Sequence, residues 1–269
     1  MALPPASDSS TALVTGASSG IGEAIARELA SRGHGVTLVA RRVERLRELA
    51  AEFTERHGVR AEVLAADLGE ADARETLAKS IEGLGLGVEI VVNNAGFGDG
   101  KPVVDADLSR LLEMVRLNCE ALLDLQQRYL PAMVERGHGA VLNVASTAAF
   151  QPLPNNATYA ATKAFVLHLS EAAHAELRGT GVSVCALCPG PVRTEFMQSA
   201  EGLETAEEQL PGMFWMSAEA VAKEAVDGLE KGKRVVIPGL MNRAGAITGQ
   251  HAPRALLLPT AKRLWGRVL

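Results

Sequence analysis

The sequence has few cysteines and no long hydrophobic run. Its 269 residues include three cysteines, an odd and sparse set that is not a disulfide framework and suits a reducing compartment. No segment reaches the roughly 18 consecutive apolar residues that a membrane-spanning helix needs. The first ten residues lack the charged start and apolar core of a signal peptide. We therefore expect a cytoplasmic protein in which residues 1–10 form a flexible N-terminus.

The sequence also lacks a recognisable metal site. Its six histidines are scattered along the chain. Cys185 and Cys188 form a C-x-x-C pair, a motif that occurs in redox and metal sites. The run VSVCALC reads as a buried strand, in which residues three apart point to opposite faces, and no second pair accompanies it. We favour two packed strand residues, because buried cysteine behaves as a small hydrophobe.

Positive charge is concentrated at one end of the chain. Residues 231–269 hold eight Lys or Arg and no acidic residue, and the rest of the chain holds 19 bases against 32 acids. An acidic body argues against nucleic-acid binding. The extension 240–269 is basic and amphipathic, which fits a helix on an anionic membrane surface or one packed on the body or on a second subunit. We favour packing, because Pro253 and Pro259 interrupt the short apolar stretch.

Short apolar runs alternate with amphipathic stretches along the chain. Composition (47% hydrophobic, 22% charged) fits a globular protein with a sizeable core. Strands are predicted at 11–15, 35–40, 60–65, 88–93, 140–145, 182–188 and 234–238. Helices are predicted near 20–32, 43–57, 70–83, 107–136, 156–178 and 217–230. Near-continuous apolar strands separated by helices predict a Rossmann-like, doubly wound, seven-stranded parallel sheet in a three-layer α/β/α domain over residues 11–239.

A glycine-rich loop joins the first predicted strand to the first predicted helix. The segment TGASSGIG follows the G-x-x-x-G-x-G spacing, which lets a pyrophosphate approach backbone N–H groups at a helix N-terminus. Three glycines also occur in ordinary turns, but this position in a doubly wound sheet favours dinucleotide binding. The residues predicted to bind are Gly16, Ser18, Ser19, Gly20, Ile21 and Gly22.

The end of the second strand indicates which dinucleotide is bound. NAD sites commonly carry an acid there, whereas an arginine accommodates the 2′-phosphate of NADP. Here Arg41 and Arg42 follow Ala40, so we predict NADP(H), although both arginines could simply begin a charged helix. Further cofactor contacts are predicted where the third and fourth strands end, at Asp67, Leu68, Asn94, Ala95 and Gly96.

Tyr159 and Lys163 stand four residues apart on a predicted helix and therefore share a face. A phenol has an ordinary pKa of about 10, and a nearby ammonium would stabilise the phenolate and make it a usable acid-base group. Ser146 follows the strand at 140–145, where its hydroxyl could hold a carbonyl oxygen. Taken alone, Tyr159 and Lys163 could equally well be two side chains on the surface of one helix with no catalytic role. The glycine loop and the serine favour catalysis.

Together these motifs resemble the short-chain dehydrogenase/reductase family. The resemblance extends from Thr11 to about Pro238 and rests on TGASSGIG, NNAG, Asn118, Ser146, YAATK and PG. It implies a Ser-Tyr-Lys active site in which Asn118 holds a water that links Lys163 to solvent. It also implies that the segment after the sixth strand lies along the nicotinamide, with Pro189, Gly190, Val192 and Thr194 in contact. Many NADP(H) members carry a basic residue where this chain has Ser19, so Arg41, Arg42 and Ser18 would have to hold the 2′-phosphate.

The substrate is predicted to be a small apolar carbonyl or alcohol. NADPH would deliver hydride, Tyr159 would supply the proton, and Ser146 would position the oxygen. Lys163 would lower the Tyr159 pKa and bind the nicotinamide ribose, so Tyr159 and Lys163 are also predicted to contact the cofactor. Residues 195–216 mix apolar and acidic side chains and read as a substrate lid or as an ordinary surface helix. The residues predicted to line the substrate cleft are Phe97, Ser146, Gln151, Tyr159, Phe196 and Phe214.

Two other functions are consistent with a dinucleotide fold. A redox sensor or scaffold would bind NADP(H) without turnover, but such proteins commonly lose the catalytic Tyr or Lys. An epimerase or dehydratase acting on sugar nucleotides would need a larger C-terminal substrate domain. We therefore favour an oxidoreductase. The resemblance also implies a homodimer or homotetramer, in which helices 107–136 and 156–178 pair between subunits.

Overall fold

A seven-stranded parallel sheet forms the centre of the molecule. The computed structural model describes residues 3–196 and 211–268, with the side chains of 264–268 left out. The strands lie in the order β3-β2-β1-β4-β5-β6-β7, so the strand order reverses between β1 and β4. Ligands of open α/β sheets bind at the carboxyl ends of the strands beside such a reversal. The strands are β1 Ser10–Thr15, β2 Val36–Ala40, β3 Ala61–Ala65, β4 Gly87–Asn93, β5 Gly139–Val144, β6 Val182–Leu187 and β7 Val235–Val236.

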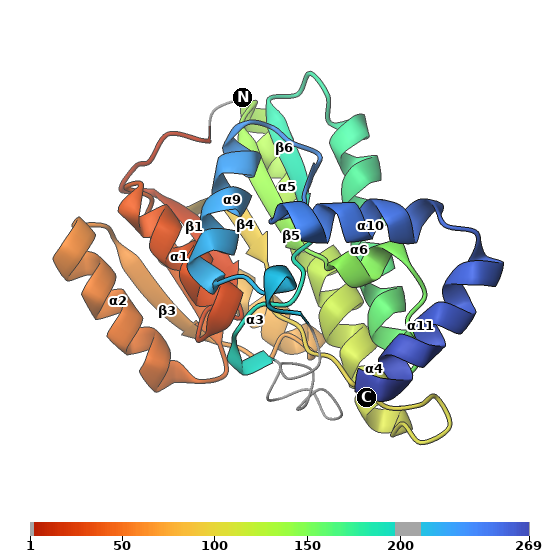
Figure 1. The fold of residues 1–269 in the computed structure, drawn as a ribbon. Helices are drawn as coiled ribbons and strands as arrows, with labels where there is room; N and C mark the ends of the chain where they lie inside the picture. Colours follow the sequence, from red (N-terminus) through yellow and green to blue (C-terminus); the bar gives the residue numbers. More distant parts are fainter. Residues whose placement is uncertain (1–2, 197–210, 269) are drawn as a thin grey trace.

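Helices cover both faces of the sheet and complete the predicted three layers (Figure 1). Residues of α1, α2 and α9 pack on one face, and residues of α3, α5 and α6 pack on the other. Every residue of β1, β5 and β6 is buried, which is why these strands read as uninterrupted apolar runs. The helices are α1 Gly20–Ser31, α2 Val43–His57, α3 Ala71–Gly83, α4 Leu108–Val115, α5 Leu122–Arg136, α6 Ala157–Glu176, α9 Ala218–Glu230, α10 Leu240–His251 and α11 Arg254–Val268.

Two predicted elements differ from the structure. The strand expected at 234–238 is a two-residue edge strand, because it pairs only with the end of β6 and is followed by Pro238, which has no N–H to donate. The helix expected over 107–136 contains a π-helical segment, η1 (Arg116–Ala121), between α4 and α5. Such segments occur frequently at functional sites.

The cysteines and the N-terminus are placed by packing. Cys185 and Cys188 are both fully buried and belong to two different core clusters, as expected for residues on opposite faces. Leu3 packs against the larger core cluster and Pro4 is buried, so part of the predicted flexible segment 1–10 contacts the body. Among the described residues, no group of His, Cys, Asp and Glu could hold a metal ion. Within that same part of the chain, no helix is long and apolar enough to cross a membrane.

Candidate active site

The glycine loop is held against the end of β4 by the Asn94 side chain. Its Nδ2 donates to the carbonyl oxygens of Thr15 (2.9 Å) and Gly16 (3.2 Å). A Cβ at Gly16 would lie 2.8 Å from this Nδ2, and one at Gly22 would overlap the same atom. Gly16 also has a φ of 63°, which L side chains rarely adopt. Both glycines are therefore required for the close approach of the two segments.

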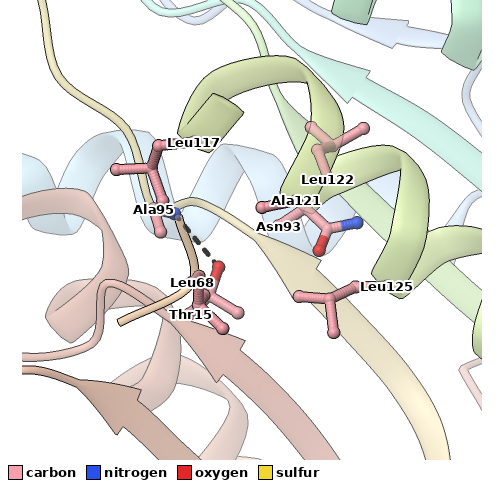
Figure 2. A pocket seen from close by; sticks show the side chains of 8 residues that line it. All are labelled: Thr15, Leu68, Asn93, Ala95, Leu117, Ala121, Leu122 and Leu125. Carbon is pink, nitrogen blue, oxygen red and sulfur yellow. Dashed lines mark hydrogen bonds between the residues drawn. The ribbon is translucent and has the colours of Figure 1, made fainter. Parts of the chain in front are cut away.

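Thr15 is a site residue that sequence reasoning missed. Its Oγ1 accepts hydrogen bonds from the backbone N–H groups of Asn94 (2.9 Å) and Ala95 (3.0 Å) and donates to the carbonyl of Val92 (3.1 Å). Figure 2 shows Thr15 beside Ala95 at the edge of a cavity of about 10 Å³, which is room for one water molecule. Thr15 thus fixes the turn that follows β4. Its position directly before the first loop glycine was the available signal.

Three of the predicted cofactor residues pack in or against the apolar core. Leu68 is buried and lines the cavity of Figure 2, Ala95 packs beside it, and Ile21 packs against the larger core cluster. Ser19 is the N-cap residue of α1, and its side chain makes no capping hydrogen bond.

Arg41 and Arg42 lie in different surroundings at the end of β2. Arg42 donates from Nε (3.2 Å) and Nη2 (3.1 Å) to Ser18 Oγ in the glycine loop, and it forms an ion pair with Glu195 at 2.8 Å. The Arg41 side chain is 79% exposed and stands 3.8 Å from Asp67. Of the predicted group, Arg42 and Ser18 are joined, and Arg41 lies beside Asp67 instead. Glu195 was not predicted to join it and places an acid among the cations.

Ser146, Tyr159 and Lys163 converge where β5 ends. Ser146 is the N-cap residue of η2 (Thr147–Phe150), a 3₁₀ turn, and its Oγ accepts a hydrogen bond from the N–H of Ala148 at 3.1 Å. Lys163 Nζ donates to the carbonyl oxygen of Val144 (2.8 Å) and lies 5.7 Å from the centroid of the Tyr159 ring. The predicted Ser-Tyr-Lys group is therefore formed by the end of one strand and the first turns of α6.

Asn118 lies in the π-helical segment, and its side-chain amide makes three hydrogen bonds to neighbouring residues. Its Oδ1 accepts from the N–H of Phe97 (3.1 Å), and its Nδ2 donates to the carbonyl of Phe97 (3.0 Å) and to Thr162 Oγ1 (3.1 Å). A Cβ at Gly96 would lie 2.7 Å from this Oδ1 and 3.6 Å from Lys163 Nζ. Asn118 thus fixes the chain beside Lys163, and its predicted role in holding a water stays a prediction.

Burial controls the charge states of the two titratable groups. It raises the pKa of Tyr159 to about 12, because the phenolate loses its hydration, and a hydrogen bond with Ser146 acts in the opposite direction. Burial lowers the pKa of Lys163 to about 8. We expected the ammonium to bring the phenol pKa down, but desolvation is the larger effect on Tyr159. At neutral pH Tyr159 is a neutral phenol and Lys163 is mostly protonated.

The segment after β6 crosses from the serine to the glycine loop. The Pro189 carbonyl accepts from the N–H of Thr147 at 2.9 Å, and Val192 pairs with Met216 in an isolated β-bridge. The Thr194 side chain lies 3.1 Å from the position that a Cβ would take at Gly20. The segment 189–194 is thus anchored beside η2 at one end and beside the glycine loop at the other.

The predicted substrate residues are only partly brought together. The rings of Phe196 and Tyr159 lie 5.8 Å apart, tilted by 47°. Phe97 lies under the Arg110 guanidinium instead, at 5.0 Å. Gln151 and Phe214 contact α10, as described below. Most of the predicted lid 195–216 lies outside the described residues.

Comparison with known proteins places the whole set of motifs in one family. A model described as short chain dehydrogenase matches residues 10–204. The very-long-chain 3-oxoacyl-CoA reductase of Anas platyrhynchos is 39% identical over 189 residues, which cover 68% of this chain and 60% of that protein. The chain therefore spans less than two thirds of the length of this relative.

Solved structures resemble the chain over almost its entire length. A short-chain dehydrogenase from Sphingobium yanoikuyae in complex with NADPH superposes with a TM-score of 0.79 and 35% identity, covering 93% of this chain and 95% of that one. The bulky-bulky ketone specific alcohol dehydrogenase from Comamonas testosteroni superposes with a TM-score of 0.75 and 30% identity, covering 98% and 96%.

Proposed function

This chain belongs to the short chain dehydrogenase family, and from that premise we propose that it interconverts a carbonyl compound and an alcohol with NADP(H) as its hydride carrier. The observation that carries the proposal is the convergence of Ser146, Tyr159 and Lys163 at the carboxyl edge of the sheet, beside the glycine loop. The nicotinamide supplies or accepts the hydride, and the protein supplies the proton and holds the reacting oxygen.

The residues present fit an NADP nucleotide. The glycine loop leaves no room for a Cβ at Gly16 or Gly22 and ends at the N-terminus of α1, whose dipole favours anions. Arg42 and Ser18 are joined over this loop, so a 2′-phosphate would meet a guanidinium there. Glu195 occupies part of the same guanidinium. We infer that its carboxylate gives way to the phosphate, because two anions on one cation repel each other.

Tyr159 is the proton donor for carbonyl reduction. Its pKa of about 12 keeps the phenol protonated at neutral pH, so a proton is available when the substrate oxygen becomes negative. Ser146 donates a second hydrogen bond to that oxygen and stabilises its developing charge. Lys163 keeps a positive charge beside the tyrosine ring, which favours loss of the phenolic proton. In the oxidative direction the same groups act in reverse, with the phenolate as the base.

The substrate is an apolar ketone, aldehyde or 3-oxoacyl-like compound. Phe196 packs on Tyr159 at the reacting end of the site, and both also lie close to Gly98, whose Cβ would stand 3.3 Å from Phe196 and 3.4 Å from Tyr159. An apolar wall on the catalytic tyrosine favours substrates with hydrophobic groups next to the carbonyl. The relatives named above are a very-long-chain 3-oxoacyl-CoA reductase and a bulky-bulky ketone specific alcohol dehydrogenase, which fits this interpretation.

Replacing Tyr159 with Phe tests the proposal. The ring and its packing remain and only the proton donor is lost, so NADPH-dependent reduction of a ketone series of graded length should decrease by orders of magnitude while NADPH still binds. The matched control is Tyr129→Phe, because the Tyr129 hydroxyl is buried and has no hydrogen-bond partner among the described residues. Full turnover by Tyr159→Phe would refute the assignment. NADPH binding by wild type without turnover of any ketone in the series would favour a binding-only protein.

A further inference from the structure

Helix α10 is the first helix of the C-terminal extension, outside the 10–204 segment matched by the family model. It packs against η2, the 3₁₀ turn that begins directly after Ser146 (Figure 1). Its buried residues are Asn242, Ala246 and Gly249, spaced by four and three residues, and so lie on one face of the helix. The helix therefore has a single inner face directed at the site. One member of that face, Asn242, is polar.

Asn242 binds two backbone carbonyl groups that come from different parts of the chain. The side chain is 5% exposed, and its Nδ2 donates to the carbonyl oxygens of Phe214 at 3.1 Å and Pro238 at 3.2 Å. Phe214 ends η3 (Gly212–Phe214), where the chain returns from the predicted lid, and Pro238 follows β7. A carboxamide nitrogen carries two hydrogens, so both are used.

The rest of the same side chain presses on the loop predicted to contact the nicotinamide. A Cβ at Gly190 would overlap Cγ, Oδ1 and Nδ2 of Asn242, so only glycine permits this approach. From Gly190 the chain continues to Val192, which bridges to Met216, and to Thr194, which stands over Gly20 of the glycine loop. The contact at Asn242 thus bears on a segment that reaches across the nucleotide site.

We propose that Asn242 is a positioning residue, which joins loop 189–194 and the returning end of segment 195–216 into one wall of the active site. The inference rests on the proposed function. The Asn242 amide nitrogen holds the Phe214 and Pro238 carbonyls by hydrogen bonds. Packing of the same side chain against Gly190 sets the distance between Gly190 and α10. Without the Asn242 side chain, loop 189–194 can move toward α10. The loop would then no longer hold a fixed position against the nicotinamide.

The test compares Asn242→Leu with Gln250→Leu. Leucine has the same number of side-chain heavy atoms and the same branching as asparagine but is bulkier and cannot donate, and Gln250 is an exposed amide on the same helix. In Asn242→Leu we expect the Kd for NADPH to rise at least fivefold and kcat/KM for NADPH to fall at least tenfold. Hydrogen exchange should become faster in residues 189–194 and 211–216 and stay unchanged in the glycine loop. Gln250→Leu should match wild type in all three measurements.

A structural role alone predicts a different result. A lower midpoint of thermal unfolding with unchanged NADPH affinity and unchanged exchange in 189–194 would overturn the inference. The variant Gly190→Ala presses on the same contact from the opposite side and keeps the asparagine itself. It should also weaken NADPH binding at least fivefold, and wild-type affinity there would equally contradict the proposal. Binding and exchange are measured without turnover, so a protein that reduces no ketone refutes the proposed function while these two measurements still decide the role of Asn242.

Discussion

At the scale of single residues, Lys163 is a cation kept in an unfavourable environment. It is buried, its pKa is lowered to about 8, and it retains a hydrogen bond to the Val144 carbonyl. Its ordinary pKa is 10.5, so holding the charged form in the folded protein costs free energy. A residue selected for stability alone would be apolar here. The desolvation of the ammonium is offset by the rest of the core, as the proposed catalytic role of Lys163 requires.

Replacing Lys163 with Met should stabilise the protein while abolishing turnover. Below pH 8 the folded wild type carries the desolvated charge. We therefore expect the free energy of unfolding of the variant to exceed that of wild type by about 1–3 kcal/mol. The variant leaves the Val144 carbonyl without its lysine donor, which makes this gain smaller.

The pH dependence of this difference has a defined sign. Between pH 8 and 10.5 the folded wild type loses the proton that its unfolded chain retains, so wild-type stability rises with pH and the advantage of the variant shrinks. Urea unfolding of both proteins from pH 7 to 10.5 measures it. A constant difference over this range would show that Lys163 is not destabilised by burial.

At the scale of elements, α10 also contacts the predicted substrate side of the site. A Cβ at Gly249 would lie 2.7 Å from Gln151 Oε1. Glycine at this position of α10 therefore leaves room for the Gln151 side chain. Asn242 and Gly249 lie on one helical face and contact two different loops. The helix therefore connects the cofactor side with the substrate side, which the sequence of the extension did not suggest.

Replacing Gly249 with Ala should change the substrate KM and leave NADPH binding intact. The new methyl group pushes the Gln151 amide aside, and we expect the KM for the ketone to change at least threefold with the Kd for NADPH within twofold. Gly245→Ala is the matched control, because a Cβ there meets nothing within 4 Å. Equal ketone KM values in both variants would argue that Gln151 does not line the substrate cleft.

At the scale of the whole molecule, large apolar side chains lie exposed on the helices predicted to pair between subunits. These side chains are 37–46% exposed: Leu112 and Val115 on α4, Leu123 on α5 and Phe165 on α6. Scattered apolar residues are normal on a monomer, but several on neighbouring helices indicate an interaction surface. We propose that two copies of the chain associate through α4, α5 and α6.

A charge in this surface should dissociate the oligomer. Phe165→Glu places a carboxylate at a 40% exposed position on α6, so we expect sedimentation equilibrium to give the mass of one chain, against two or four chains for wild type. Leu240→Glu, at an 82% exposed position on α10, is the control and should leave the mass unchanged. If only Leu240→Glu lowered the mass, the extension would be the subunit contact. A monomeric wild type would contradict the proposal altogether.

The sequence by itself determined the architecture and the position of most proposed site residues at one edge of the sheet. The predicted helix 43–57 has the same bounds in the structure, and the glycine loop, Arg42, Ser146, Tyr159 and Lys163 meet at one edge of the sheet as expected. These features depend on local periodicity and on turn residues at strand ends, which a chain carries within short windows.

Only the tertiary structure decided which distant groups meet and how they ionise. Glu195 pairs with Arg42, and Asn242 contacts Gly190, across separations that no periodic pattern spans. The charge states of Tyr159 and Lys163 also depend on the tertiary structure. Burial raises the pKa of Tyr159 and lowers that of Lys163, and burial depends on everything that surrounds a group. Short-range patterns place side chains at the edge of the sheet. Packing between remote segments then sets their distances, partners and charges.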